Sequence, residues 1–415
     1  MNLIKKEIKE LLTPSTVAVI LVITVLFGSM GKLIGAAKDE AKKKPTIAIV
    51  IKEKGPLADR LREFLRTKTT LIYEGDSREE GFAALKASKK GVALVIIDQG
   101  FEKTLLAGKP ALIKVEWIMR GAGLMDTISS GILERTFLDL NKQISAHLID
   151  ATKDKGDLSS SHVLNPTVKF ENTHYKSKRI PALSPNKIAQ VLVSQSITIP
   201  MAVMIIIMLG GSMVITSMGL EKENKTLETL LTMPVSRTTI VMGKIMGSAA
   251  VGLFMAAFYM VGFKFYVSSF ETGTIDLALL GLDLNAFDYI LVGVSLFSSL
   301  LFGLAMAMLL GIMAKDYKSA QVLTYPIMGL AMIPMFLTMY RDFDTVTPLV
   351  KTVLFVIPFS HPMMAMRHLT LDNYLLVSLG IVYSLTVTAI LIAIIVKIFK
   401  TDKLITGIMP LRKRA

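Results

Sequence analysis

The sequence predicts an α-helical membrane protein with six transmembrane helices and an α/β domain inserted between the first and second helices. Hydrophobic residues make up 52% of the chain, charged residues only 19%, and the mean hydropathy is +0.54. These values are too apolar for an ordinary soluble globular protein. A helix needs a run of about 20 apolar residues to cross a bilayer core. The chain contains such runs at 15–34, 191–218, 240–263, 289–313, 320–339 and 374–398.

The first of these runs is predicted to be a retained membrane anchor rather than a signal peptide. Lys5, Lys6 and Lys9 precede it, as basic residues precede the apolar core of a secretory signal. Its apolar stretch is longer than a typical signal core, and no small-residue cleavage site follows it. We therefore expect a transmembrane helix here.

The segment 38–190, between the first and second runs, is long enough for one domain with its own core. Strand-like apolar segments alternate with segments of helical spacing, which predicts a small α/β layer with parallel strands. The strand-like segments are 46–51, 69–73, 92–97 and 112–118, and the helical ones are 57–66, 79–87 and 125–149. The Ser-rich stretch 157–162 and the Pro-containing stretch 180–185 are expected to be linkers.

The insert offers no constellation typical of catalysis or metal binding. His147, His162 and His174 are far apart and lack metal-ligand spacing. The chain has no Cys, which excludes disulfides, thiolate metal sites and Cys nucleophiles. It also has no Gly-x-x-x-x-Gly-Lys-Ser/Thr sequence, so it is not expected to bind ATP by that route. The prediction is a non-enzymatic subunit without catalytic residues, metal site or cofactor of its own.

The net charge of +14 could suggest nucleic-acid binding, and the block 42–44 is three lysines. A Gly-rich phosphate loop and a basic patch interleaved with aromatic residues are both missing from the sequence. The positive charge is better explained by the rule that short basic loops stay in the cytoplasm. No nucleic-acid partner is therefore expected.

Lys and Arg also predict the orientation in the membrane. They cluster near the amino terminus and after the second, fourth and sixth runs, which all fall on one side if the chain crosses six times. The segment 267–288, between the third and fourth runs, has no Lys or Arg but four acidic residues. Both termini are therefore predicted to be cytoplasmic, and residues 38–190 extracytoplasmic, in a multi-pass protein of the cell membrane.

A short charged segment at about 221–236 connects the second and third runs. Leu227, Leu230 and Leu231 fall on one stripe of a helix that Pro234 would close, with Glu228 on the opposite face. Two or three turns are marginally stable alone, so packing must hold such a helix. Two interpretations are open: an interfacial helix that only joins two transmembrane helices, or a docking element for a soluble partner.

The same segment resembles the motif of ABC-2-type exporter permeases, in which acidic residues, a Leu-Leu pair and a Pro-x-Ser turn precede Gly-Lys. Lys225 departs from this motif, which usually has Gly at that position. The matching residues are Glu221, Lys222, Glu223, Thr226, Leu227, Glu228, Leu230, Leu231, Pro234, Ser236, Gly243 and Lys244.

This resemblance implies a permease subunit that pairs with a second permease, expected to be an identical copy, and with two ATP-binding subunits that hold ATP and Mg²⁺. The segment 226–233 would be the coupling helix that seats in the ATPase, and residues 2–12 would lie along the cytoplasmic interface. The implied domains are 1–37, with interface helix and first transmembrane helix, 38–190, and 191–415, with transmembrane helices two to six.

The last distinctive segment, 347–370, contains an apolar run of about ten residues, which is too short to cross a bilayer. It resembles the re-entrant helices that this family places before its last transmembrane helix, with Pro358, Phe359 and Pro362 at the turn. An interfacial loop with apolar anchoring is the alternative.

The composition of the predicted transmembrane cores bears on the cargo. Carboxylates are missing from the predicted transmembrane cores, which argues against an ion relay in this subunit and favours efflux of a hydrophobic or amphipathic drug, lipid or peptide. A sodium-efflux permease and a non-transporting membrane sensor driven by an ATPase are the alternatives.

Overall fold

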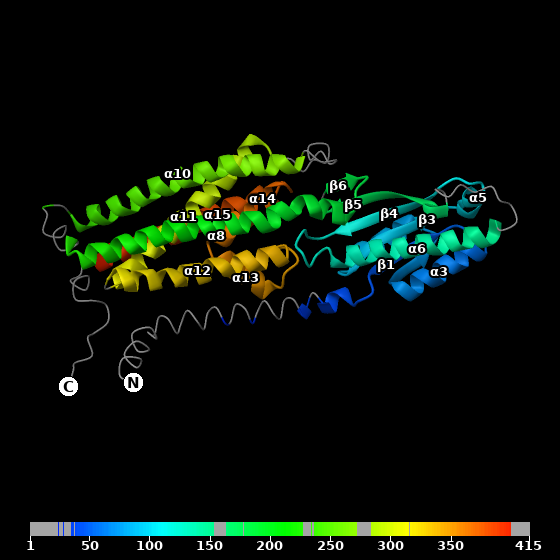
Figure 1. The fold of residues 1–415 in the computed structure, drawn as a ribbon, viewed down its shortest axis with the longest axis horizontal. Coiled ribbons are helices and arrows are strands. Elements are labelled where there is room, and N and C mark those ends of the chain that lie inside the picture. The colour runs from blue at the N-terminus through cyan, green and yellow to red at the C-terminus, as the bar shows by residue number, and fades with distance from the viewer. Residues whose placement is uncertain are drawn as a thin grey trace, which may run out of the picture. The chain divides into compact units, whose positions relative to one another are not determined.

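The computed structural model describes residues 24, 28, 35–36, 38–152, 163–176, 178–226, 234, 236–271, 284–314 and 316–399. Contacts within the chain divide it into two compact units. Unit 1 is helical and comprises 1–31, 194–339 and 346–415, and unit 2 comprises 32–193 and 340–345. Figure 1 shows the ribbon with its helices and strands labelled.

Unit 2 is built on a six-stranded sheet in the order β2-β1-β3-β4-β5-β6. Strand β1 is parallel to β2 and β3, β4 is parallel to β5, and the pairs β3–β4 and β5–β6 are antiparallel. The strands are β1 (Thr46–Ile51), β2 (Thr70–Gly75), β3 (Gly91–Ile97), β4 (Ala111–Met119), β5 (Thr167–Tyr175) and β6 (Lys178–Pro181).

Helices cover both faces of this sheet because successive residues of a strand point to opposite faces. In β1, Ile47 and Ile49 pack with α3 (Pro56–Lys68), α5 (Phe101–Leu106) and α6 (Ile128–Thr152), whereas Ala48 and Val50 pack toward α4 (Arg78–Ala87). All of β1 after its first residue is buried, and so is all of β3, as expected of central strands in an α/β layer.

The expectation of parallel strands is wrong where the predicted strands 92–97 and 112–118 pair, and the sheet also contains a second antiparallel pair that the sequence did not predict. Strand β4 returns antiparallel to β3, and β6 returns antiparallel to β5. The stretch 180–185 is also not simply a linker, because β6 ends at Pro181 and the long helix α8 begins at Pro185. The other predicted linker, 157–162, lies outside the described residues.

Among the described residues, four helices of unit 1 are long and apolar enough to cross a membrane. They are Ile197–Glu223 within α8 (Pro185–Glu223), α11 (Ala286–Met313), α12 (Tyr317–Tyr340) and Tyr374–Ile398 within α15 (Tyr374–Phe399). The helices α13 (Pro348–Val356) and α14 (Ser360–Leu369) are bent by 112° at their junction and would make a fifth crossing if they formed one span.

These helices coincide with four of the six predicted apolar runs. The run 240–263 lies within α10 (Arg237–Glu271), of which Thr238–Phe254 is a shorter apolar helix. The run 15–34 lies outside the described residues except for 24 and 28. The described part of the chain therefore has four or five candidate crossings.

Helix α11 lies at the centre of the bundle. In its most apolar stretch of 18 residues, 61% of the residues are buried, whereas 28% are buried in the corresponding stretch of α15. Helix α10 exposes large apolar side chains, among them Met246, Phe254 and Phe258. Such exposed apolar faces fit contact with lipid or with another apolar helix.

Candidate functional site

Three consecutive motif residues at the end of α8 each bond to a different part of the helical bundle. Glu221 pairs with Lys244 of α10, Lys222 reaches the carboxyl end of α11, and Glu223 reaches the amino end of α12. Their side chains project in different directions because residues on a helix advance by about 100° each. The end of α8 is thus tied to three neighbouring helices.

The ion pair between Glu221 and Lys244 joins α8 to α10. Both side chains are about one-fifth exposed, so water screens the pair less than it would screen a surface ion pair. Lys244 Nζ also lies 3.3 Å from Met218 Sδ, and Ser217 Oγ donates to Glu221 Oε1 over 3.4 Å. These contacts fix the start of α10 against the last turns of α8.

Lys222 joins α8 to the end of α11. Its ammonium group donates to the carbonyl oxygen of Ala314 over 2.8 Å and also to the carbonyl oxygen of Ile312. The last carbonyl groups of a helix lack partners within the helix and carry partial negative charge. The lysine therefore caps α11 with a charge of the favourable sign.

Glu223 joins α8 to α12. Its Oε2 accepts from the backbone N–H of Tyr317, the first residue of α12, over 3.1 Å. An acidic group is favourable there because free N–H groups and the helix dipole give a helix amino end partial positive charge. Glu221, Lys222 and Glu223 therefore satisfy three different electrostatic needs of their neighbours.

Glycines at the contacts between these helices support this arrangement. A Cβ at Gly219 would lie 2.6 Å from Ala320 Cβ and 2.9 Å from Asp316 O, and one at Gly311 would lie 2.9 Å from Met218 Cβ. Glycine thus allows the backbones of α8, α11 and α12 to approach closely where the ties form.

The remaining positions of the motif differ in their surroundings. Lys225 has φ of 55°, the left-handed conformation that glycine adopts most easily and that Gly would supply in the usual motif. Ser236 caps α10, since its Oγ accepts from Thr239 N over 3.1 Å. Thr226 and Pro234 are exposed. Leu227, Glu228, Leu230 and Leu231 lie outside the described residues.

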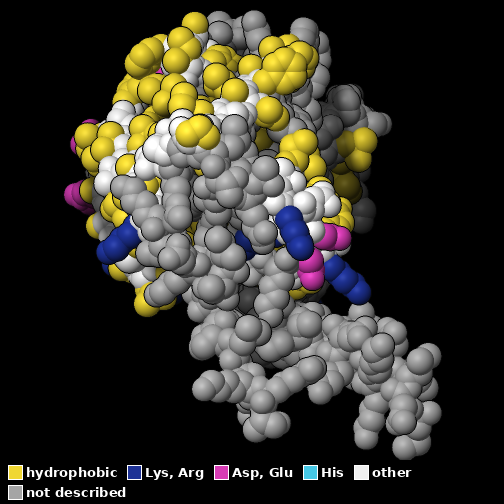
Figure 2. Space-filling view, turned by 90° about the vertical axis from the view of Figure 1, so that its left-hand side faces the viewer, with side chains coloured by type: hydrophobic (Ala, Val, Ile, Leu, Met, Phe, Trp, Pro, Cys, Tyr) yellow, Lys and Arg dark blue, Asp and Glu magenta, His cyan; other side chains and the backbone are white. Residues whose placement is uncertain are grey.

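Figure 2 looks onto the end of unit 1 where α8 ends and α12 begins. Hydrophobic side chains cover much of the described surface, and a few Lys, Arg, Asp and Glu side chains interrupt it. A cavity of about 370 Å³ lies between α8, α10 and α11, lined by apolar residues such as Val214 and Met308 and by Glu221 and Lys244.

The junction of α13 and α14 is the second candidate site. Pro358 and Phe359 lie in the break, and Pro362 lies in the first turn of α14. The carbonyl of Pro358 accepts from Ser299 Oγ of α11 over 2.7 Å, and the carbonyl of Ile357 accepts from Ser360 Oγ over 2.7 Å. Irregular backbone at membrane depth requires internal partners of this kind.

Phe359 fixes the break to the centre of the bundle. Its side chain is fully buried, and its ring lies edge-on to that of Phe302 of α11 at 5.1 Å between centroids. A Cβ at Gly303 would lie 3.3 Å from the Phe359 ring, so glycine leaves the space that the ring occupies.

Sequence reasoning missed a buried polar group on α14. His361, Arg367 and His368 are all at most 6% exposed, and Arg367 donates to the carbonyl of Thr338 over 3.4 Å. The basic pair at 367–368 directly after an apolar segment was the available signal. Among the described residues, no group of three or more His, Asp or Glu side chains is arranged to hold a metal ion.

Comparison with protein families gives a match over nearly the whole chain. The family described as "ABC-2 family transporter protein" matches residues 14–396. The chain belongs to the ABC-2 transporter family. It is therefore a multi-pass membrane permease that lacks an ATPase of its own. The family implies a transport role and an ABC ATP-binding partner.

A solved structure also resembles part of this ABC-2 permease. It is a crystal structure of a domain of a "putative ABC type-2 transporter" from Thermotoga maritima MSB8, with 24% sequence identity and a TM-score of 0.32. The match covers 36% of this chain and 99% of that one. No protein of curated function matches the chain.

Proposed function

We propose that this permease is the membrane subunit of an ATP-driven exporter, and that the segment 221–236 couples it to a separate ATP-binding subunit. The observation that carries the proposal is the set of three ties from Glu221, Lys222 and Glu223 to α10, α11 and α12. A partner that moved this segment would move the ends of four helices together.

We assign contact with the ATP-binding partner to those residues of the segment that make none of these three contacts. Thr226 and Pro234 are exposed, and Leu227, Glu228, Leu230 and Leu231 stand between them in the sequence. Glu221 and Glu223 are given an inward role in the coupling, because their carboxylates bond to helices of the same chain. The partner would bind ATP and Mg²⁺, so this chain needs no cofactor.

The assembly is proposed to contain two permease copies and two ATP-binding subunits. Exposed apolar side chains on α10 and α15, such as Phe258 and Val382, provide surfaces for lipid and for the second copy. Both termini and the segment 221–236 are assigned to the cytoplasm and residues 38–190 to the outside, following the distribution of Lys and Arg.

A hydrophobic or amphipathic compound is the proposed cargo. The cavity between α8, α10 and α11 combines apolar side chains with one ion pair, which suits a molecule with an apolar body and a polar group. The break between α13 and α14 is proposed to be a re-entrant turn that supports the outer end of the pathway. Sodium efflux and ATP-driven signalling without transport are separated from this proposal by the experiment below.

The test uses inverted vesicles that contain the permease and its ATPase. ATP-dependent accumulation of rhodamine 6G, an amphipathic dye, and of radioactive sodium is measured beside ATP hydrolysis. Glu221→Lys places two lysines together and should lower dye accumulation about tenfold, since a partly buried ion pair is replaced by repulsion. The double variant Glu221→Lys and Lys244→Glu should restore it.

Lys318→Glu is the matched control, because Lys318 is exposed at the same end of the bundle and has no described carboxylate partner. Normal transport by Glu221→Lys would contradict the coupling role. ATP-dependent movement of sodium alone would replace the proposed cargo, and ATP hydrolysis that moves neither probe would favour signalling.

Because the chain has no Cys, labelling of Pro234→Cys and Lys52→Cys from each side of the membrane tests the orientation.

A further inference from the structure

Unit 2 contains a cavity of about 1220 Å³ at the edge of the sheet where β1, β2 and β3 begin. The strand starts Thr46, Thr70 and Gly91 line it, together with the end of β4, the first residues of α6 and residues of the segment 341–345. All lining residues belong to unit 2. Pockets of about 300–1,000 Å³ hold drug-sized ligands, so this cavity has room for more than a single small ion.

The lining is strongly basic. It contains eight Lys and Arg side chains, one His and only three Asp and Glu side chains. Two of the acidic groups are already paired, Glu40 with Lys43 at 2.7 Å and Asp344 with Lys176 at 2.6 Å. The walls therefore carry an excess of positive charge, and a concave surface focuses such a field.

The third acidic group, Asp126, is also engaged within the protein. Its Oδ2 accepts from the backbone N–H groups of Gly123 and Asp342, over 3.2 and 2.9 Å. Burial raises the pKa of the Asp126 carboxyl, although hydrogen bonds from the backbone of Asp342 and the side chain of Thr345 oppose the shift. Asp126 thus holds the segment 341–345 in the cavity wall rather than neutralising a lysine.

Apart from Arg341, whose charge acts on Asp126, five of the basic side chains have no carboxylate within ion-pair distance among the described residues. They are Lys44, Lys86, Lys89, Lys90 and Arg120. They come from separate parts of the unit: the segment before β1, the end of α4, the turn before β3 and the end of β4. The fold thus brings together like charges that repel one another unless an anion lies between them.

The turn that carries Lys89 and Lys90 is held in place. Arg120 donates to the carbonyl of Ser88 over 2.6 Å and also to the carbonyl of Gly91, so its guanidinium spans the turn. A Cβ at Gly91 would lie 2.7 Å from Leu85 O, which shows how closely the turn packs on α4. A preorganised turn loses less conformational entropy when a ligand binds.

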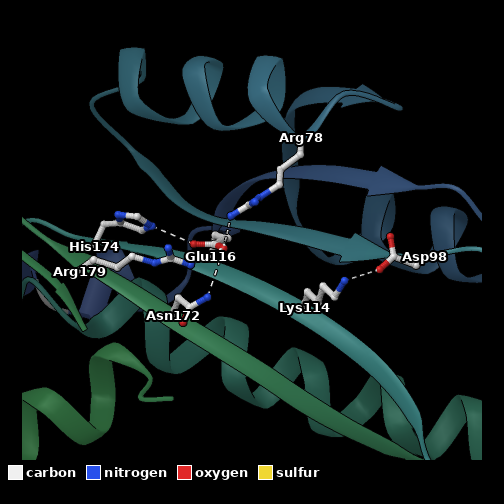
Figure 3. Close-up of polar contacts among 7 residues, drawn as sticks. All are labelled: Arg78, Asp98, Lys114, Glu116, Asn172, His174 and Arg179. Atoms are coloured by element: carbon white, nitrogen blue, oxygen red, sulfur yellow. Dashed lines mark hydrogen bonds and ion pairs between the residues drawn. The ribbon is translucent and has the colours of Figure 1, made fainter. Parts of the chain in front are cut away.

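His174 occupies another part of the wall, and its ring is held by two neighbours. Its Nε2 lies 2.8 Å from Glu116 Oε2, and its ring lies 4.7 Å from that of Phe82. Figure 3 shows Glu116 surrounded by Arg78, Asn172, His174 and Arg179. This carboxylate is already shared among several donors and leaves the lysine charges unbalanced.

We propose that this cavity binds an anion with clustered phosphate groups, supplied either as a phospholipid headgroup or as a soluble compound. Lys and Arg side chains are the usual ligands of phosphate oxygens. Among the described residues that line the cavity none is Phe, Tyr or Trp, so it offers no platform for stacking a nucleobase. The wall residues Arg341 and Thr345 belong to the connection between α12 and α13, and a ligand here would restrain that connection.

The test titrates the full-length protein, purified in a neutral detergent, with tripolyphosphate in a calorimeter. Saturable binding is expected, and its affinity should fall as salt screens the charges. The variant Lys89→Glu with Lys90→Glu should weaken binding by about tenfold or more, because two attractive charges become repulsive. Lys103→Glu with Lys109→Glu is the matched control, since both lysines are exposed and lie outside the cavity.

Fluorescence of Trp117 checks that the variants fold, because it is the only Trp of the chain and is fully buried in β4. Competition with short-chain cardiolipin, whose headgroup carries two phosphate groups, compared with short-chain phosphatidylcholine, identifies the source. Displacement by the anionic lipid assigns a headgroup, and its failure to displace assigns a soluble phosphate compound. No saturable binding, or equal weakening in both double variants, would overturn the proposal. These readouts involve neither ATP nor transport, so they are independent of the proposed export activity.

Discussion

The contact of Gly219 with the start of α12 gives a direct test of the tied end of α8. Gly219→Ala adds one methyl group where the added Cβ would lie 2.6 Å from Ala320 Cβ, 2.9 Å from Asp316 O and 3.1 Å from Tyr317 Cα. Two of these three atoms belong to the backbone and cannot move aside by a change of rotamer. The first turn of α12 must therefore shift away from α8.

The expected cost follows from two opposing effects. Overpacking a closely packed contact costs about 1–3 kcal/mol. Replacing Gly by Ala inside a helix returns roughly 0.5–1 kcal/mol through helix propensity. The difference between the two effects spans about 0–2.5 kcal/mol. Because the clash involves backbone atoms, we expect a net loss of about 1–2 kcal/mol. The hydrogen bond from Tyr317 N to Glu223 should weaken at the same time.

The assay compares variants by the fraction of detergent-solubilised protein that stays monodisperse after heating, together with ATP-dependent dye accumulation. Gly293→Ala is the control, because Gly293 lies in α11 and a Cβ there would meet nothing within 4 Å. It should be neutral or stabilising. Gly219→Ala with Ala320→Gly removes the shortest contact and should recover part of the loss.

Equal thermal stability of Gly219→Ala and Gly293→Ala would refute the close approach of α8 to α12. A stable Gly219→Ala variant with normal transport would also show that the end of α8 does not need this geometry for coupling. A stable variant with reduced transport would instead show that the contact is needed for the helix movement of transport and not for stability.

Two further predictions concern the bundle centre and unit 2. Phe359→Ala empties a fully buried site and should cost about 3–5 kcal/mol, whereas Phe254→Ala removes a side chain that is 63% exposed and should cost far less in the same heating assay. In unit 2, burial alone would raise the pKa of Glu116, but hydrogen bonds from His174 and Asn172 and nearby arginine charges outweigh it and lower the pKa. A lowered pKa stabilises the fold above the ordinary value of 4.5 and loses this contribution as pH falls through the folded value. The melting temperature followed by Trp117 should therefore differ between the wild type and Glu116→Gln at neutral pH, and this difference should shrink below about pH 4.5; a difference independent of pH would contradict it.

The sequence predicted the central strands well because their residues are apolar without interruption. Segments 46–51 and 92–97 coincide with β1 and β3, apart from one residue at the start of β3. Strand β5 was missed, because its sequence, Thr-Val-Lys-Phe-Glu-Asn-Thr-His-Tyr, is mostly polar and its burial begins only at Glu171. Its place in the sheet comes from pairing with β4 over nine residues, which a local pattern cannot reveal.

The direction of β4 could have been inferred from helix length. Helix α3 has 13 residues and spans about 20 Å, which matches the length of β1 and returns the chain for a parallel strand. Helix α5 has six residues and spans only about 9 Å, whereas the seven residues of β3 extend about 23 Å. The chain therefore turns back beside β3, and β4 runs antiparallel.

The candidate site illustrates a different limit of the sequence. The motif located the segment 221–236, but the partners of its charged residues lie 23 to 94 positions away along the chain. The resemblance implied a coupling role for the segment that holds Glu221 and Glu223, but it did not say what their side chains contact. Their coupling role stays a prediction, and the structure adds that their carboxylates bond within the chain.

Some motif residues bond within the chain and others are exposed, so the two kinds have different roles in one short segment. Four residues bond to other helices of the chain, and each neutralises a helix end or an opposite charge: Glu221, Lys222, Glu223 and Lys244. Such contacts are costly to break singly because the partner is left uncompensated. A force on the exposed residues between them would therefore displace the ends of α8, α10, α11 and α12 together rather than unfold the segment. Since α11 also holds the α13–α14 break through Ser299 and Phe359, the central helix gives the two candidate sites a continuous packed connection.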